Sequence, residues 1–112
     1  MVRFRQDHDS LTVMLFGEID HHASQNLRTE IERFIKKTMP KHLIFDFSKV
    51  SFMDSSGIGM IIGRYKTMIS MNGHVSACGL QKPVERLFKM AGLHRIISIM
   101  TSQEDKIHES SN

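Results

Sequence analysis

Residues 43–78 read LIFDFSKVSFMDSSGIGMIIGRYKTMISMNGHVSAC and contain one complete strand–helix–strand unit. Residues 43–47 are nearly all apolar, which is typical of a strand covered on both faces. After them, apolar side chains recur at helical spacing: Ile58, Ile61, Ile62, Tyr65, Met68 and Ile69. We expect Gly73 to end this helix in a left-handed conformation, before a strand over 74–78. The order strand, helix, strand predicts a right-handed crossover and a parallel pair of strands.

A second amphipathic helix precedes this unit. Its apolar stripe falls at i, i+4, i+8, i+11 and i+12: Ala23, Leu27, Ile31, Phe34 and Ile35. Arg28, Glu32 and Arg33 occupy the side expected to face solvent. The helix is predicted to end near Thr38-Met39, because Pro40 disfavours helical geometry at the residue before it.

The N-terminal residues predict a hairpin. Residues 11–16 form an apolar, β-branched run that we expect to stop at Gly17. Residues 3–6 alternate like an edge strand, and residues 7–10 are expected to make the turn between the two strands. The first strand of the sheet should therefore be antiparallel to the second.

Beyond residue 78 the alternation of strands and helices continues. Pro83 suits the first turn of a third helix, whose stripe Val84, Leu87, Phe88 and Ala91 ends at Gly92. Residues 96–100 are predicted to form a last strand, and the polar tail 102–112 a frayed helical turn around Ile107. We expect residues 1–112 to be a single α/β sandwich with a mixed, mostly parallel sheet, an antiparallel edge strand and helices packed on it.

Composition narrows the classes of function. The chain has 112 residues, 40% of them apolar and 24% charged, which is a globular rather than a disordered balance. Its net charge is +3, but lysine and arginine are spread evenly along it, which argues against direct nucleic-acid binding. No apolar run is long enough to span a membrane. The start Met1-Val2-Arg3-Phe4 differs from a signal segment, so we expect a cytoplasmic protein, with the lone Cys78 as a small core residue.

In mostly parallel sheets, binding and catalytic residues usually lie where strands end and helices begin. That rule indicates residues 51–59, SFMDSSGIG. Asp54, Ser55 and Ser56 crowd the start of the helix, although one of them would suffice as its N-cap. Gly57 and Gly59 follow and each costs about 1 kcal/mol of helix propensity. A plain cap and an open docking surface are both compatible with this pattern, and the same holds for Asp20 before the first helix.

At this point the sequence resembles the anti-sigma factor antagonists of the STAS domain family, above all those of the sporulation sigma-F system. Three blocks in order carry the resemblance: residues 51–66, Gly17-Glu18-Ile19-Asp20-His21-His22, and residues 84–93. It covers residues 11–100.

The resemblance implies a binding switch rather than an enzyme. Family members bind an anti-sigma factor that is also a serine kinase, and so release the sigma factor. The kinase phosphorylates the first serine of Asp-Ser-Ser, here Ser55, and the modified antagonist lets go until a serine phosphatase restores it. The expected partner-binding residues are Asp20, His21, Met53, Asp54, Ser56, Gly57 and Ile58. No cofactor is implied, although weak nucleotide binding stays open.

Two enzymatic alternatives use the same loop. A hydrolase would take Ser55 as nucleophile, but Met53-Asp54-Ser55-Ser56-Gly57 lacks the first glycine of a nucleophile elbow. A phospho-receiver would accept phosphate on Asp46 or Asp54 with Mg²⁺, using Glu18 and Asp20 as its acidic pair. Metal binding is not expected, because adjacent His21 and His22 point about 100° apart on a helix.

Overall fold

The computed structural model describes residues 1–100. Along the chain, strands and helices alternate after an initial hairpin. The elements are β1 (Val2–Asp7), β2 (Ser10–Ile19), α1 (His21–Thr38), β3 (His42–Met53), α2 (Ser55–Ser70), β4 (His74–Cys78), α3 (Lys82–Met90), the 3₁₀ helix η1 (Leu93–Arg95) and β5 (Ser98–Met100). The predicted tail turn around Ile107 lies outside the described residues.

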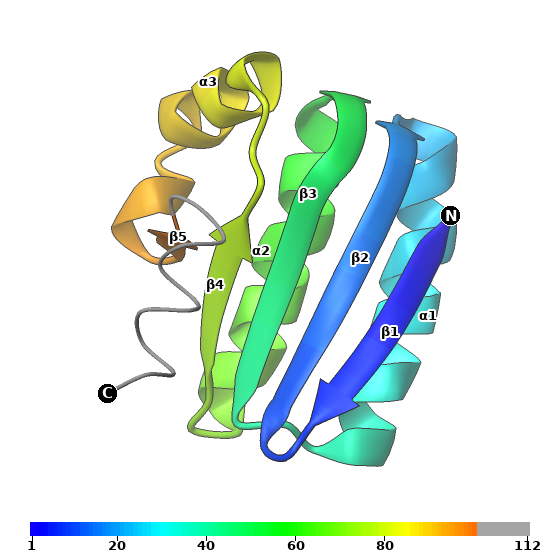
Figure 1. The fold of residues 1–112 in the computed structure, drawn as a ribbon, viewed down its shortest axis with the longest axis vertical. Helices are drawn as coiled ribbons and strands as arrows, with labels where there is room; N and C mark the ends of the chain where they lie inside the picture. The colour runs from blue at the N-terminus through cyan, green and yellow to red at the C-terminus, as the bar shows by residue number, and fades with distance from the viewer. Residues whose placement is uncertain (101–112) are drawn as a thin grey trace.

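The strands form one sheet in the order β1-β2-β3-β4-β5. β1 is antiparallel to β2, and the other three pairs are parallel. Helices α1 and α2 lie side by side behind the sheet, and α3 lies at the end where β2 and β3 finish (Figure 1). The predicted α/β sandwich with an antiparallel edge strand is confirmed.

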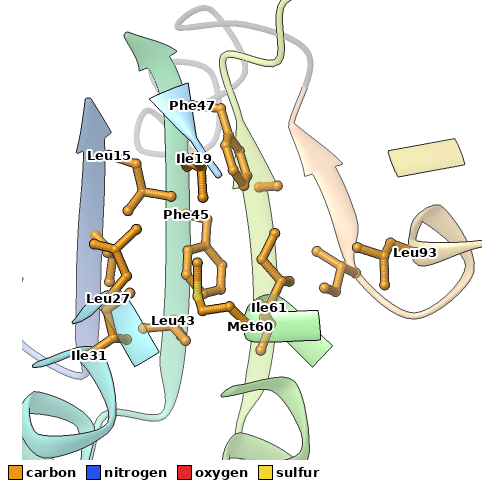
Figure 2. Packing of buried hydrophobic residues seen from close by; sticks show 14 of the residues in the cluster. Leu15, Ile19, Leu27, Ile31, Leu43, Phe45, Phe47, Met60, Ile61 and Leu93 are labelled. Atoms are coloured by element: carbon orange, nitrogen blue, oxygen red, sulfur yellow. The ribbon is translucent and has the colours of Figure 1, made fainter. Parts of the chain in front are cut away.

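The core fills the space between the sheet and the helices (Figure 2). In β3, Leu43, Phe45 and Phe47 are fully buried, whereas Ile44 and Asp46 are half-buried. The expectation that this strand is covered on both faces was therefore wrong. Its alternation reflects a sheet with α1 and α2 on one face only. Cys78 is buried in β4, as predicted.

Strand β2 does not stop at Gly17. Gly17 has a φ of +85°, and the register with β3 shifts between Gly17 and Glu18, which is a β-bulge rather than an end. The strand continues to Ile19, which pairs with Met53 of β3. A second register shift lies between Met14 and Phe16, so β3 has two more residues than β2 over the paired stretch, and the two strands end together at Ile19 and Met53.

Two further element ends differ from expectation. The left-handed residue after α2 is Asn72, with a φ of 61°, and not Gly73. A Cβ at Gly73 would lie 2.9 Å from the Lys41 carbonyl oxygen, so close packing explains that glycine. The last strand is only Ser98–Met100, because the amides of Ile96 and Ile97 both donate to the Leu93 carbonyl and prolong the 3₁₀ turn.

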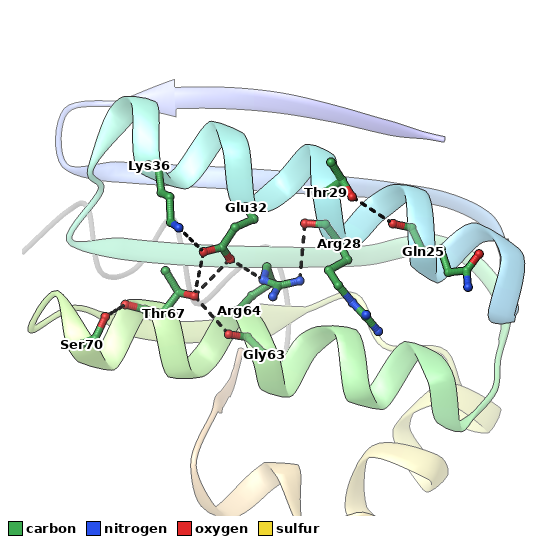
Figure 3. Close-up of polar contacts among 9 residues, drawn as sticks. All are labelled: Gln25, Arg28, Thr29, Glu32, Lys36, Gly63, Arg64, Thr67 and Ser70. Carbon is green, nitrogen blue, oxygen red and sulfur yellow. Dashed lines mark hydrogen bonds and ion pairs between the residues drawn. The ribbon is translucent and has the colours of Figure 1, made fainter.

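A polar cluster joins α1 to α2 (Figure 3). Arg64 is 8% exposed, and its Nε lies 2.7 Å from Glu32 Oε1. The Thr67 hydroxyl lies 3.0 Å from both Glu32 oxygens, and Lys36 Nζ lies 3.6 Å from Oε2. Glu32, which was expected to face solvent, is instead the centre of this contact between the helices.

Candidate functional site

The site lies where β2 and β3 end and α1 and α2 begin. Each strand is followed by an aspartate in extended geometry: Asp20 caps α1 and Asp54 caps α2. Asp20 Oδ1 accepts a bond of 2.9 Å from the Ala23 amide, and Asp54 Oδ1 accepts one of 2.9 Å from the Ser56 amide. The Asp54 amide donates to the Ile19 carbonyl at 3.2 Å and so ties the two strand ends together.

A chain of hydroxyl groups runs inward from Asp54. The Ser56 hydroxyl donates to Asp54 Oδ1, and Ser56 Oγ lies 3.1 Å from the hydroxyl oxygen of Ser24 on α1. Ser24 is only 1% exposed. Because the single Ser56 proton goes to Asp54, the Ser24 hydroxyl donates to Ser56. The Ser56 hydroxyl therefore donates one hydrogen bond and accepts another.

Ser55 is in a different situation. It is the first residue of α2 and is exposed to solvent. Among the described residues, no side chain or backbone group forms a hydrogen bond with its hydroxyl. Its position at the start of a helix places it beside backbone amides that have no partner within the helix, which is favourable for an anionic group.

The carboxylate of Asp54 is held in its anionic form. The hydrogen bond from the Ser56 hydroxyl lowers the Asp54 pKa most, and the backbone amides of Ser56 and Gly57 and nearby His21 lower it further, against an opposing effect of desolvation. The rim of the site is thus acidic, since the exposed carboxylate of Asp20 adds to the half-buried one of Asp54.

The predicted site residues fall into two layers. Asp20, His21 and Ser55 are exposed, and Asp54 and Ser56 are half-buried. Met53, Gly57 and Ile58 lie beneath them and are buried. The lower layer supports the surface from below.

Sequence reasoning missed two residues of this region. Ser24 gave no signal, because an ordinary helical serine does not reveal what it faces across the fold. Phe52 is 47% exposed next to Met53, and an aromatic side chain on the outward face of a strand end was a signal that could have been used.

Other kinds of site are not evident in residues 1–100. No group of three His, Cys, Asp or Glu side chains there is arranged to hold a metal ion. His21 and His22 are both exposed, and His21 Nε2 lies 3.3 Å from Gln25 Nε2. No helix in the same range is long and apolar enough to cross a membrane.

The class of this protein follows from its similarity to a known family, because the STAS domain matches residues 1–109. The chain belongs to the STAS domain family. Within it, the chain is similar to the anti-sigma F factor antagonist of Paenibacillus polymyxa, with 36% identity over 88% of this chain and 85% of that protein. It groups with the anti-sigma factor antagonists, which are regulatory binding proteins and not enzymes, as expected.

Two solved structures resemble the fold. The phosphorylated form of the Bacillus cell fate determinant SpoIIAA has a TM-score of 0.77 and 26% identity and covers 100% of both chains. The unphosphorylated form of the antagonist SpoIIAA has a TM-score of 0.76 and 24% identity, over 99% of this chain and 97% of that one.

Proposed function

We propose that this chain binds an anti-sigma factor through the surface around Asp20 and Ser55, and thereby frees a sigma factor in the cytoplasm. The anti-sigma factor is also a serine kinase in this proposal. It phosphorylates Ser55, the modified chain dissociates, and a serine phosphatase returns it to the binding form. The kinase brings its own nucleotide, so the chain itself needs no cofactor.

The state of the two adjacent serines supports Ser55 as the modified residue. The Ser55 hydroxyl is exposed and has no partner among the described residues, whereas Ser56 is held between Asp54 and buried Ser24. A kinase must seat a hydroxyl in its own active site, and breaking two hydrogen bonds to extract Ser56 would cost about 1 kcal/mol each. This contrast is the observation that carries the proposal.

The contact surface follows from the two layers of the site. Asp20, His21, Asp54, Ser55 and Ser56 would touch the partner, and exposed Phe52 adds apolar area beside them. Three buried residues would act indirectly, because they fix the position of the first turn of α2 relative to the sheet: Met53, Gly57 and Ile58.

Phosphate at Ser55 should leave this fold intact. A phosphoserine carries about −1.5 to −2 charges near neutral pH, and the amino end of a helix favours such a charge. The similar TM-scores of 0.77 and 0.76 to phosphorylated and unphosphorylated relatives support an unchanged scaffold.

Release would then come from repulsion inside the complex. Acidic groups or a nucleotide phosphate of the partner would approach a site whose rim already carries Asp20 and Asp54. Two unit charges of the same sign at 4 Å cost about 4 kcal/mol at an effective dielectric constant near 20. Half of that would weaken binding more than tenfold.

The test is to mix the chain with its anti-sigma kinase and radiolabelled ATP. Wild type and Ser56→Ala should incorporate label, and Ser55→Ala should not. Ser55→Asp should fold normally by circular dichroism but bind the kinase at least about tenfold more weakly, while the neutral isostere Ser55→Asn retains binding. Labelling of Ser55→Ala, or equal affinity of Ser55→Asp and wild type, would falsify the proposal.

A further inference from the structure

The edge of the sheet at β1 offers unused backbone hydrogen-bonding groups. Phe16 N donates to Met1 O at 3.1 Å, and β1 and β2 then pair residue by residue up to Asp7 opposite Ser10. In an antiparallel pair, every second residue bonds to the neighbouring strand. The odd-numbered residues of β1 therefore bond to β2, and the amides and carbonyls of Val2, Phe4 and Gln6 point away from the sheet.

A groove of about 420 Å³ runs beside this edge, between β1 and the outer face of α1. The ring of Phe4 stacks on that of Phe34 with centroids 4.1 Å apart, which forms an apolar floor. The lining residues combine this floor with charged side chains: Val2, Phe4, Glu30, Arg33, Phe34 and Lys37. The residues with outward backbone groups, Val2 and Phe4, are thus also part of the groove.

Cations flank the edge on both faces. Arg33 and Lys37 line the groove, against a single Glu30. On the opposite face of β1, Arg3 and Arg5 are exposed, with the Arg3 guanidinium 5.8 Å from the centre of the Phe16 ring. The ligand that complements this arrangement carries negative charge.

We propose that β1 is a docking site for an extended acidic segment of a partner protein, which adds to the sheet as a further strand. Its backbone would bond to Val2, Phe4 and Gln6. Side chains of one face would be apolar and lie over Phe4 and Phe34. Carboxylates of the other face would lie opposite Arg3 and Arg5, where pairs of opposite charge stabilise a sheet.

A second copy of this chain fits the edge less well. An antiparallel pair of β1 strands centred on Phe4 places Arg3 of one copy opposite Arg5 of the other, twice. Like charges directly opposite destabilise a sheet, and charged side chains on an edge strand commonly prevent self-pairing. The same two arginines that oppose a second copy favour an acidic strand.

The test uses a fluorescein-labelled peptide in which glutamate alternates with valine. We expect it to bind wild type, and to bind Arg3→Glu/Arg5→Glu at least about tenfold more weakly. Lys66→Glu/Arg86→Glu is the charge-matched control, because both residues are exposed cations on α2 and α3 away from β1, and it should bind like wild type. Urea denaturation of each variant checks that the fold is retained.

Amide hydrogen exchange provides a second measurement that only strand addition explains. The peptide should protect the outward amides of Val2, Phe4 and Gln6, while those of Arg3 and Arg5 change little. The proposal is overturned if this alternation is absent, if a peptide with proline at its centre binds as tightly as the original, or if single-stranded oligothymidylate of equal charge binds as well. Protection of the same amides by self-association, without peptide, would identify a second copy as the occupant and also overturn it.

Discussion

Two glycines in the first turns of α2 show how differently one residue type can be used. A Cβ on Gly57 would lie 2.4 Å from Met53 Cγ and 3.2 Å from Ile19 Cγ2, so the ends of β2 and β3 leave no room for it. A Cβ on Gly59 would meet nothing within 4 Å. Gly57 is required by packing beneath the site, whereas Gly59 leaves a bare, exposed surface one turn from Ser55.

The pair makes a matched prediction. Gly57→Ala should lower the free energy of unfolding by about 1–3 kcal/mol, because the added methyl overpacks a buried site. Gly59→Ala should raise it by up to about 1 kcal/mol, because alanine favours the helix and fits without contact. Urea denaturation of both variants checks this. Equal effects of the two changes would mean that the packing under Ser55 is looser than described.

At the scale of elements, one largely buried ion pair joins α1 to α2. Both helices carry a cap of the site at their amino end, and Arg64 and Glu32 join them further along (Figure 3). Burial lowers the pKa of Arg64, and the Glu32 carboxylate opposes that shift. The Arg64 side chain is only 10% exposed, so its charge is stabilised mainly by this partner rather than by water.

Removing both partners should therefore cost less than the sum of the two single removals. Glu32→Gln should destabilise the chain by about 3 kcal/mol, because it leaves Arg64 charged and unpaired. The apolar double variant Glu32→Leu/Arg64→Met should cost less than the sum of its single changes by at least about 1 kcal/mol. Thr67 tolerates the loss, since its hydroxyl also lies 3.2 Å from the Gly63 carbonyl.

The control for this cycle is Lys36→Gln. Lys36 also faces Glu32, but its side chain is 69% exposed, so the change should cost no more than about 0.5 kcal/mol. Urea midpoints of the five variants (Glu32→Gln, Glu32→Leu, Arg64→Met, the double variant and Lys36→Gln) give the comparison. Additive effects of the Glu32 and Arg64 changes would contradict the role assigned to the pair.

At the scale of the whole molecule, the two ends of the sheet carry different polar groups. The carboxyl ends of β2 and β3 carry the site, and the opposite end carries a pair of stacked histidines. The rings of His42 and His74 are 4.2 Å apart, and His42 Nε2 lies 2.7 Å from the Ser76 hydroxyl oxygen. Burial, and then the neighbouring His74, lower the pKa of His42 below 6.5.

This predicts acid sensitivity of the fold. A histidine with a depressed pKa binds fewer protons when the chain is folded than when it is unfolded. The stability of the chain is therefore undiminished by His42 above pH 6.5, and it falls as the pH drops toward and through the pKa of His42 in the folded state. His42→Gln should show a smaller loss between about pH 7.5 and about pH 5 than wild type, and the exposed control His94→Gln should not. Urea midpoints at both pH values check this; equal losses in wild type and His42→Gln would count against it.

Much of the architecture follows from local sequence. The stripe from Ala23 to Ile35, the stop before Pro40 and the Asp20 cap all correspond to α1 as it is built. The errors lie where distant contacts matter. Gly17 continues β2 because it pairs with β3, and the register shift after it is accommodated between the two strands. Residues 43–47 are covered on one face because α1 and α2 both pack on the same side of the sheet.

The sequence by itself determined the order of elements, the two aspartate caps and the position of Ser55 at the first turn of α2, because periodicity and capping depend on residues within four positions of one another. Only the tertiary structure decided which neighbouring serine is free, since Ser56 is held by Ser24, 32 positions away. The burial of Arg64 and the outward backbone groups of β1 have the same origin: they arise from contacts between elements, which no local pattern records.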